Sequence, residues 1–116
     1  MSPAVLRFLA ERYEQIEVRY DPAQRALWAY QRPRPRPCFN LELLSEIKRL
    51  QEAIQRACHG HDEVTSPVRF LIIGSRTKGA FNLGGDLSLL LELIRNRDRQ
   101  GLRRYALACV EVLYLN

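Results

Sequence analysis

The sequence predicts an α/β domain in which helices cover a small sheet. Residues Ile16–Tyr20 alternate apolar and polar side chains, as a half-buried strand does. Val68–Gly74 is a short apolar and β-branched run, typical of a strand that is buried on both faces. Other segments repeat apolar residues at spacings of three and four, which is the period of a helix face. The predicted order is β-β-α-β-α-α in one domain over residues 1–116, a length that supports one modest core.

Composition and the placement of charged residues indicate a globular protein without a membrane span or a secretory signal. Hydrophobic residues make up 47% and charged residues 27%, so the chain has a globular composition. No apolar stretch approaches the length of a membrane span, and the N-terminal region has charges inside its apolar stretch, unlike a secretory signal. The 3 cysteines are an odd number without a pairing rhythm, which favours a reducing compartment. We therefore expect a cytoplasmic protein with no membrane contact.

The first third of the chain predicts a short helix followed by a hairpin. Residues 4–14 form the expected helix, with Leu6, Leu9 and Ala10 on one side. The strand Ile16–Tyr20 ends at the turn signal Asp21-Pro22. The aromatic-rich segment Ala26–Gln31 is then expected to be the second strand.

A connector and a long helix follow the hairpin. Arg32–Pro37 alternates arginine and proline, so half of its residues lack an N–H and the segment cannot form a helix or a central strand. We expect an extended connector. Asn40 is a good N-cap for the next helix. One face of that helix carries the apolar residues Leu43, Ile47, Leu50, Ile54 and Ala57.

Two more helices are expected after the apolar strand. Asp86 is a suitable cap for the first of them. Its predicted apolar side consists of Leu87, Leu90, Leu91 and Ile94. The last helix carries its apolar residues at Leu102, Tyr105, Ala106, Cys109, Val110 and Leu113. Cys109 lies on that apolar side, so we expect it to serve packing.

A glycine-rich stretch, Gly79–Leu87, separates the apolar strand from the first of these helices. Gly84 and Gly85 allow backbone angles that other residues avoid and let a ligand approach the main chain. Backbone N–H groups at a helix start lack helical partners, and the helix dipole adds positive potential there. The stretch therefore suits a phosphate or an oxyanion. A tight turn with a capping aspartate is the alternative interpretation.

Two known phosphate-binding motifs do not fit this stretch. Gly74–Gly79 has the spacing of the first half of a P-loop, but Ala80 and Phe81 stand where Lys and Ser or Thr are required. The dinucleotide pattern GxGxxG is absent from the sequence.

The whole segment VRFLIIGSRTKGAFNLGGDL resembles the first signature of the crotonase superfamily, also called the enoyl-CoA hydratase/isomerase superfamily. The hairpin, the Arg-Pro after its second strand and the helix near Asn40 also resemble the N-terminal half of that family. FNLGGDL, followed by LIRNRDRQGLRRYALACV, is most similar to the bacterial synthases of diffusible signal factor, a fatty-acid quorum-sensing signal. The resemblance implies a partial ClpP/crotonase-type fold.

The resemblance also implies a function. In this family the carbonyl oxygen of an acyl-CoA thioester lies in an oxyanion hole made of two backbone N–H groups, and the matching position for the first is Leu83. Gly84, Gly85 and Asp86 are then the neighbouring substrate-binding positions. The implied activity is that of an enoyl-CoA hydratase or an acyl-CoA thioesterase. Coenzyme A enters as part of the substrate, and no separate cofactor is expected.

The sequence departs from the family in one respect. The family's second oxyanion N–H and its catalytic glutamates belong to a later segment, which this sequence does not contain. The acids that the chain does carry match none of those catalytic positions: Glu42, Glu46, Glu52, Glu63, Glu92 and Glu111. We therefore expect no activity from this chain alone, and a homo-oligomer or a complementary C-terminal segment as partner. The alternative is a non-catalytic binding or assembly module, from a truncated or split crotonase.

Other candidate sites have simpler interpretations. Cys58–Glu63 gathers cysteine, histidine and acids, but it lacks a second half at zinc-site spacing, so we expect a solvated loop and no metal. Ser75 and Lys78 suggest a nucleophile and a base without an orienting third residue.

The arginines of the connector allow two interpretations. Arg32, Arg34 and Arg36 are able to approach the phosphates of coenzyme A, because Arg binds phosphate through two parallel hydrogen bonds. A solvated connector is the simpler interpretation. The run lacks interleaved aromatic residues, so we expect no nucleic-acid partner.

Overall fold

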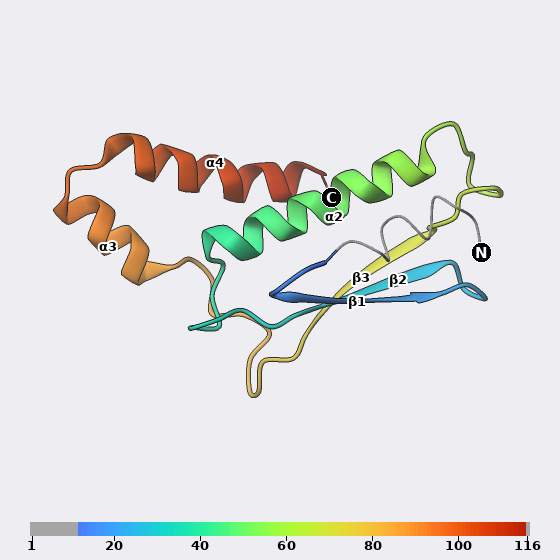
Figure 1. The fold of residues 1–116 in the computed structure, drawn as a ribbon, viewed down its shortest axis with the longest axis horizontal. Helices are drawn as coiled ribbons and strands as arrows, with labels where there is room; N and C mark the ends of the chain where they lie inside the picture. Colours follow the sequence, from blue (N-terminus) through green and yellow to red (C-terminus); the bar gives the residue numbers. More distant parts are fainter. Residues whose placement is uncertain (1–11, 116) are drawn as a thin grey trace.

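The computed structural model describes residues 12–115. Its sheet has the order β1-β2-β3, with β2 (Ala26–Gln31) in the centre. β1 (Ile16–Asp21) pairs antiparallel with β2 through the predicted hairpin, while β3 (Phe70–Ser75) pairs with β2 in parallel. Parallel neighbours need a crossover connection, and a helix supplies it here (Figure 1).

The crossover is α2 (Leu41–Cys58), and two further helices follow β3. They are α3 (Leu87–Arg95) and α4 (Arg99–Leu115). α4 packs against both α2 and α3, and α2 and α4 lie on the same side of the sheet (Figure 1). The predicted order β-β-α-β-α-α and the α/β class are therefore confirmed.

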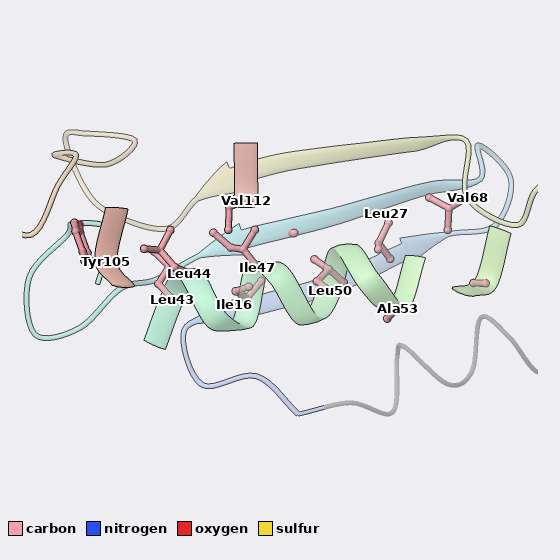
Figure 2. Packing of buried hydrophobic residues seen from close by; sticks show 12 residues of the cluster. Ile16, Leu27, Leu43, Leu44, Ile47, Leu50, Ala53, Val68, Tyr105 and Val112 are labelled. Atoms are coloured by element: carbon pink, nitrogen blue, oxygen red, sulfur yellow. The ribbon is translucent and has the colours of Figure 1, made fainter. Parts of the chain in front are cut away.

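The core lies between α2 and the sheet (Figure 2). α2 begins as predicted, because the Asn40 side chain accepts a hydrogen bond from the Leu43 N–H at 2.8 Å. Its predicted apolar face is also confirmed: Leu43, Ile47, Leu50 and Ala57 are buried, and Ile54 packs partly buried against them. From the sheet, Ile16, Leu27 and Ala29 complete the cluster.

β3 is not buried on both faces, so that prediction was wrong. It starts two residues later than predicted, at Phe70, whose exposed fraction is 50%. The other residues of β3 are half-buried. Among the described strands β3 stands at the edge of the sheet and pairs with β2 alone, and only Leu71 of β3 joins the core cluster.

The apolar sides of α3 and α4 also differ from the prediction. α3 has no buried residue, and Leu87 at its start is 77% exposed, although Leu90 packs against the core. In α4 the buried side chains are Tyr105 and Val112, whereas Leu113 is 74% exposed. α4 carries apolar residues on more than one side, so their spacing alone does not select the side that packs. Cys109 does pack against the core, as predicted.

One predicted helix is not covered by the described residues, and none of the described helices is able to span a membrane. The helix expected over residues 4–14, with Leu6, Leu9 and Ala10, falls almost wholly outside the described residues. Within residues 12–115, no helix has the length and hydropathy that crossing a membrane requires.

Candidate functional site

The glycine stretch runs beside the connector between β2 and α2, which is far from it in sequence. The Leu83 N–H donates to the Pro37 carbonyl at 2.7 Å, and the Phe39 N–H donates to the Gly84 carbonyl at 2.8 Å. A parallel bridge joins Phe39 to Gly85. These contacts form a short ladder that holds the glycine stretch against the connector, just before α3 begins.

Gly84 and Gly85, the two adjacent glycines of this stretch, have different conformations. Gly84 has φ of +94°, a left-handed backbone that glycine adopts without strain. Its N–H donates to the Asn82 side-chain oxygen at 2.7 Å. Gly85 has no left-handed φ, and a Cβ there would lie 3.8 Å from the Tyr105 hydroxyl, an ordinary contact. Of these two adjacent residues, only Gly84 therefore requires glycine for its backbone angles.

Asp86 caps α3 as predicted. Its carboxylate accepts from the Leu89 N–H at 3.2 Å and from the Arg36 guanidinium at 3.0 Å. The carboxylate is nearly inaccessible to solvent, whereas half of the Arg36 side chain is exposed. The Asp86 backbone N–H donates to the Tyr105 hydroxyl at 2.8 Å. Asp86 thus joins the start of α3 to the connector and to α4.

The four N–H groups of Leu83–Asp86 differ in their availability to a ligand. Those of Leu83, Gly84 and Asp86 already donate within the protein. The Gly85 N–H has no acceptor among residues 12–115, and Gly85 is exposed. A ligand oxygen therefore meets an open donor at Gly85, while the Leu83 donor becomes available only when its bond to Pro37 breaks.

The arginines of the connector do not act as one group. Arg36 pairs with Asp86, and Arg34 lies 3.7 Å from the Glu14 carboxylate. Arg32 and Arg34 line a cavity of about 440 Å³, together with Arg76. The connector runs through successive bends and so is less extended than predicted. The Arg34–Pro35 peptide bond is cis.

Arg76 is a basic residue of this cavity that the sequence analysis missed. Its guanidinium lies 3.9 Å from the centre of the Tyr30 ring and pairs with Glu17 at 3.0 Å. The Arg76 N–H donates to the Gln31 carbonyl at 2.8 Å. Arg32 and Arg76 directly follow two parallel strands, whose carboxyl ends meet at one edge of the sheet. The strand order was the signal that could have found Arg76.

Two of the acids have structural tasks that the contacts make plain. The Glu46 carboxylate is buried and accepts from the Gln15 N–H at 2.8 Å. Glu111 pairs with Lys48 at 2.8 Å and so links α4 to α2. Glu46 thus fixes α2 to the residue before β1, and Glu111 fixes α4 to α2.

The remaining candidates form no reactive centre in the described part of the chain. No group of His, Cys, Asp and Glu among residues 12–115 has the geometry to hold a metal ion. In the loop after α2, Asp62 accepts from the N–H groups of Val64 and Thr65, and the bonds to Thr65 lower the pKa of that carboxyl. The Ser75 hydroxyl accepts from the Thr77 N–H at 3.0 Å. Burial raises the pKa of the Cys38 thiol, so it stays protonated at neutral pH.

Comparison with known proteins supports the fold. No family model and no curated protein matches the sequence. The solved structure of DspI from Pseudomonas aeruginosa is similar at a TM-score of 0.68 and 16% identity, over 91% of this chain and 39% of DspI. A "putative enoyl-CoA hydratase" from Streptomyces avermitilis is similar at a TM-score of 0.53 and 24% identity, over 72% of this chain and 26% of that one.

This chain therefore spans well under half the length of both structures. At these identities the likeness concerns the fold. It agrees with the small sheet, the crossover helix and the two following helices described above. The expected fold class is thus confirmed, and the chain has a partial crotonase-like α/β fold.

Proposed function

We propose that the backbone of Leu83–Asp86 binds the carbonyl oxygen of an acyl-CoA thioester, within an enoyl-CoA hydratase or acyl-CoA thioesterase type of enzyme. The observation that carries this proposal is the N–H of Gly85, an exposed residue that follows the left-handed Gly84 at the start of α3 and whose N–H has no acceptor among residues 12–115. Unpaired N–H groups at a helix start attract a negative oxygen, and the helix dipole strengthens that attraction. Similarity in fold to the Streptomyces avermitilis protein supports the choice of a thioester.

The proposed role of Leu83 involves an exchange of hydrogen-bond acceptors. As half of an oxyanion hole, the Leu83 N–H exchanges the Pro37 carbonyl for the thioester oxygen. A neutral backbone hydrogen bond contributes about 0.5–1.5 kcal/mol net. A bond to an oxygen with developing negative charge is roughly twice as strong. The exchange is therefore favoured as charge builds on the thioester oxygen, which is when an enzyme needs it.

The proposed enzyme includes more than this chain. We propose that a homo-oligomer or a complementary C-terminal segment supplies the second N–H donor and the acids, in the cytoplasm. The open edge of β3 and the exposed apolar residues of α3 and α4 support such a partner, because free strand edges and apolar patches drive association. Light scattering is expected to show dimers or larger species. A stable monomer over a wide concentration range would contradict this part of the proposal.

Isothermal titration with a ketone analogue of an acyl-CoA tests the binding site. In this analogue a methylene separates sulfur from the carbonyl, so it cannot be hydrolysed. Gly84→Val is expected to abolish binding, because a β-branched residue does not adopt φ of +94° without moving the N–H groups beside it. Gly79→Val is the matched control: Gly79 also has a left-handed φ, +83°, and lies at the start of the glycine stretch, ahead of the proposed binding residues Leu83–Asp86.

Electrostatic attraction alone predicts a different pattern. In that case Gly84→Val binds like the parent, whereas the triple variant Arg32→Ala, Arg34→Ala, Arg36→Ala loses all binding. That result would leave the glycine stretch as a turn with a helix cap. The triple variant also removes Arg36, a hydrogen-bond partner of Asp86, and so changes the start of α3 as well as the charge. Arg32→Ala with Arg34→Ala is the cleaner test of charge.

The second candidate is a non-catalytic binding or assembly module, favoured by the exposed apolar residues of α3 and α4. Assays with crotonyl-CoA and a long-chain acyl-CoA, on the chain alone, bear on both candidates. We expect no turnover. Turnover that is abolished by substituting Glu42, Glu46, Glu52, Glu63, Glu92 or Glu111 would show that this chain carries its own catalytic acid. It would contradict the proposal that a partner supplies the acids.

A further inference from the structure

We propose that Tyr105 is a positioning residue: its hydroxyl fixes the glycine stretch against the connector and so sets the direction of the Gly85 N–H. The inference rests on the proposed function, because it names the residue that holds that same backbone in place. Tyr105 comes from α4, which the sequence places well beyond the glycine stretch. The expected role of Tyr105 was packing on an apolar helix side.

The Tyr105 hydroxyl joins the two segments of the short ladder. It accepts from the Asp86 N–H at 2.8 Å and donates to the Phe39 carbonyl. Asp86 follows Gly85 directly, and Phe39 is the residue that bridges to Gly85. The hydroxyl therefore closes the ladder at the end where the open N–H lies.

The position of Tyr105 in the core makes this contact rigid. Its exposed fraction is 5%, and it lies at the end of the buried cluster nearest Leu43 and Leu44 (Figure 2). A buried ring that packs against a helix has few alternative orientations. The hydroxyl at its tip is thus held at one place, 3.8 Å from where a Cβ on Gly85 would stand.

The protonation of this hydroxyl suits its two bonds. Burial raises the pKa of Tyr105 above its ordinary value, and the neighbouring Cys109 and Asp86 act in the same direction. The backbone bond from the Asp86 N–H opposes that shift, but the pKa remains raised. The phenol is therefore protonated at neutral pH and can donate to Phe39 while it accepts from Asp86.

The contact also links α4 to the proposed site. Among the side chains of α4 that the structure describes, Tyr105 and Val112 are the buried ones. Val112 lies near the other end of the helix and packs in the core without a polar group at its tip. A change at Val112 therefore weakens the packing of α4 without removing the hydroxyl, and it serves as a control for a merely structural effect.

The test is the difference in affinity between two probes. One is the ketone analogue described above, and the other is an alkyl-CoA thioether of the same length, which lacks the carbonyl. The dissociation constant of the thioether divided by that of the ketone measures what the carbonyl oxygen gains from the N–H donors. Tyr105→Phe keeps the ring and removes the hydroxyl. We expect it to lower this ratio by about three- to tenfold, which is the contribution of one hydrogen bond.

Two control variants separate positioning from stability. Tyr20→Phe removes another hydroxyl that donates to a backbone carbonyl, that of Pro67 at 2.6 Å, away from the glycine stretch. Val112→Ala loosens α4. Both are expected to lower thermal stability and to leave the ratio of the two probes unchanged. A ratio that falls equally in all three variants, or that persists in Tyr105→Phe, would overturn the inference.

A measurement on the unmodified chain covers the case in which Tyr105→Phe does not fold. The Asp86 amide precedes the first turn of α3, so its acceptor is the Tyr105 hydroxyl and not a helical carbonyl, whereas the Gly85 amide is open. We expect hydrogen exchange at Asp86 to be at least about tenfold slower. Equal exchange at the two amides would overturn the inference.

The two proposals fail in different ways. If the unmodified chain binds the ketone and the thioether equally, the proposed function fails, and this inference loses its ligand-binding content with it. If the unmodified chain prefers the ketone and Tyr105→Phe keeps that preference, only the inference fails.

Discussion

The two halves of this chain use apolar residues in contrasting ways. In the first half, β1, β2 and α2 bury their apolar sides against one another, and Leu43 has no exposed surface. In the second half, β3 places only Leu71 against the core, and α3 leaves Leu87 77% exposed. Both halves show the same helical spacing of apolar residues in the sequence. The difference shows that the spacing of apolar residues predicts an apolar side of a helix, but not whether another element of the fold buries that side.

The contrast also bears on the proposed function. The first half provides the hairpin and the helix that carry most of the buried core residues. The second half carries the glycine stretch, the open Gly85 N–H and most of the exposed apolar surface of the helices. A surface that is both apolar and next to unpaired N–H groups suits a thioester with its acyl chain, and also a partner segment that covers it. The predictions below test how far the halves differ.

The largest expected difference lies in the packing of leucines. Leu43→Ala in α2 is expected to lower the free energy of unfolding by about 2–5 kcal/mol, because it leaves a cavity in the core. Leu87→Ala in α3 is expected to change it by at most about 0.5 kcal/mol, as for other exposed positions. Urea unfolding of both variants measures this. A large loss for Leu87→Ala would show that a second copy of the chain already covers α3 in solution.

The next difference lies between the two adjacent glycines. Gly84→Ala is expected to destabilise the chain by about 1–3 kcal/mol, because alanine is strained at φ of +94°. Gly85→Ala is expected to be neutral within about 1 kcal/mol, because its Cβ makes only an ordinary contact with the Tyr105 hydroxyl. Thermal unfolding compares the pair. Equal losses would mean that the stretch does not hold the backbone described here.

The smallest effects concern the caps of α2 and α3, one in each half. Asn40→Ala and Asp86→Ala are each expected to lower the free energy of unfolding by about 1 kcal/mol. Asp86→Asn is the matched control, because it keeps a capping oxygen and removes the charge that pairs with Arg36. If Asp86→Asn loses as much stability as Asp86→Ala, the ion pair, rather than the cap, is the main contribution of Asp86.

Local features of this fold were predictable from the sequence. The caps at Asn40 and Asp86 and the apolar face of α2 depend on residues within a few positions of one another, so spacing and side-chain chemistry suffice. The exposure of β3 depends on how many strands flank it, which the strand itself does not encode. The packing side of α4 depends on what faces it, because Tyr105 and Leu113 are both apolar enough to be buried.

The same distinction holds for the candidate site. Gly84 and Asp86 were recognisable as a turn and a cap at a helix start. The bond from the Leu83 N–H to the Pro37 carbonyl joins segments that are distant in sequence, and no local pattern marks it. The contact of Tyr105 with Asp86 is equally distant, and its hydroxyl is concealed among apolar residues of α4. Such contacts follow only from the packing of whole elements.

An NMR titration of the ¹⁵N-labelled chain with the ketone analogue tests the central claim most directly. The account predicts that the largest amide shifts occur at Gly85, where the donor is open, and at Leu83, where the bond to Pro37 is exchanged. The thioether, which lacks the carbonyl, is expected to leave both amides nearly unchanged. Shifts confined to Arg32, Arg34 and Arg76, and equal for both probes, would contradict the account and reduce the site to a basic cavity.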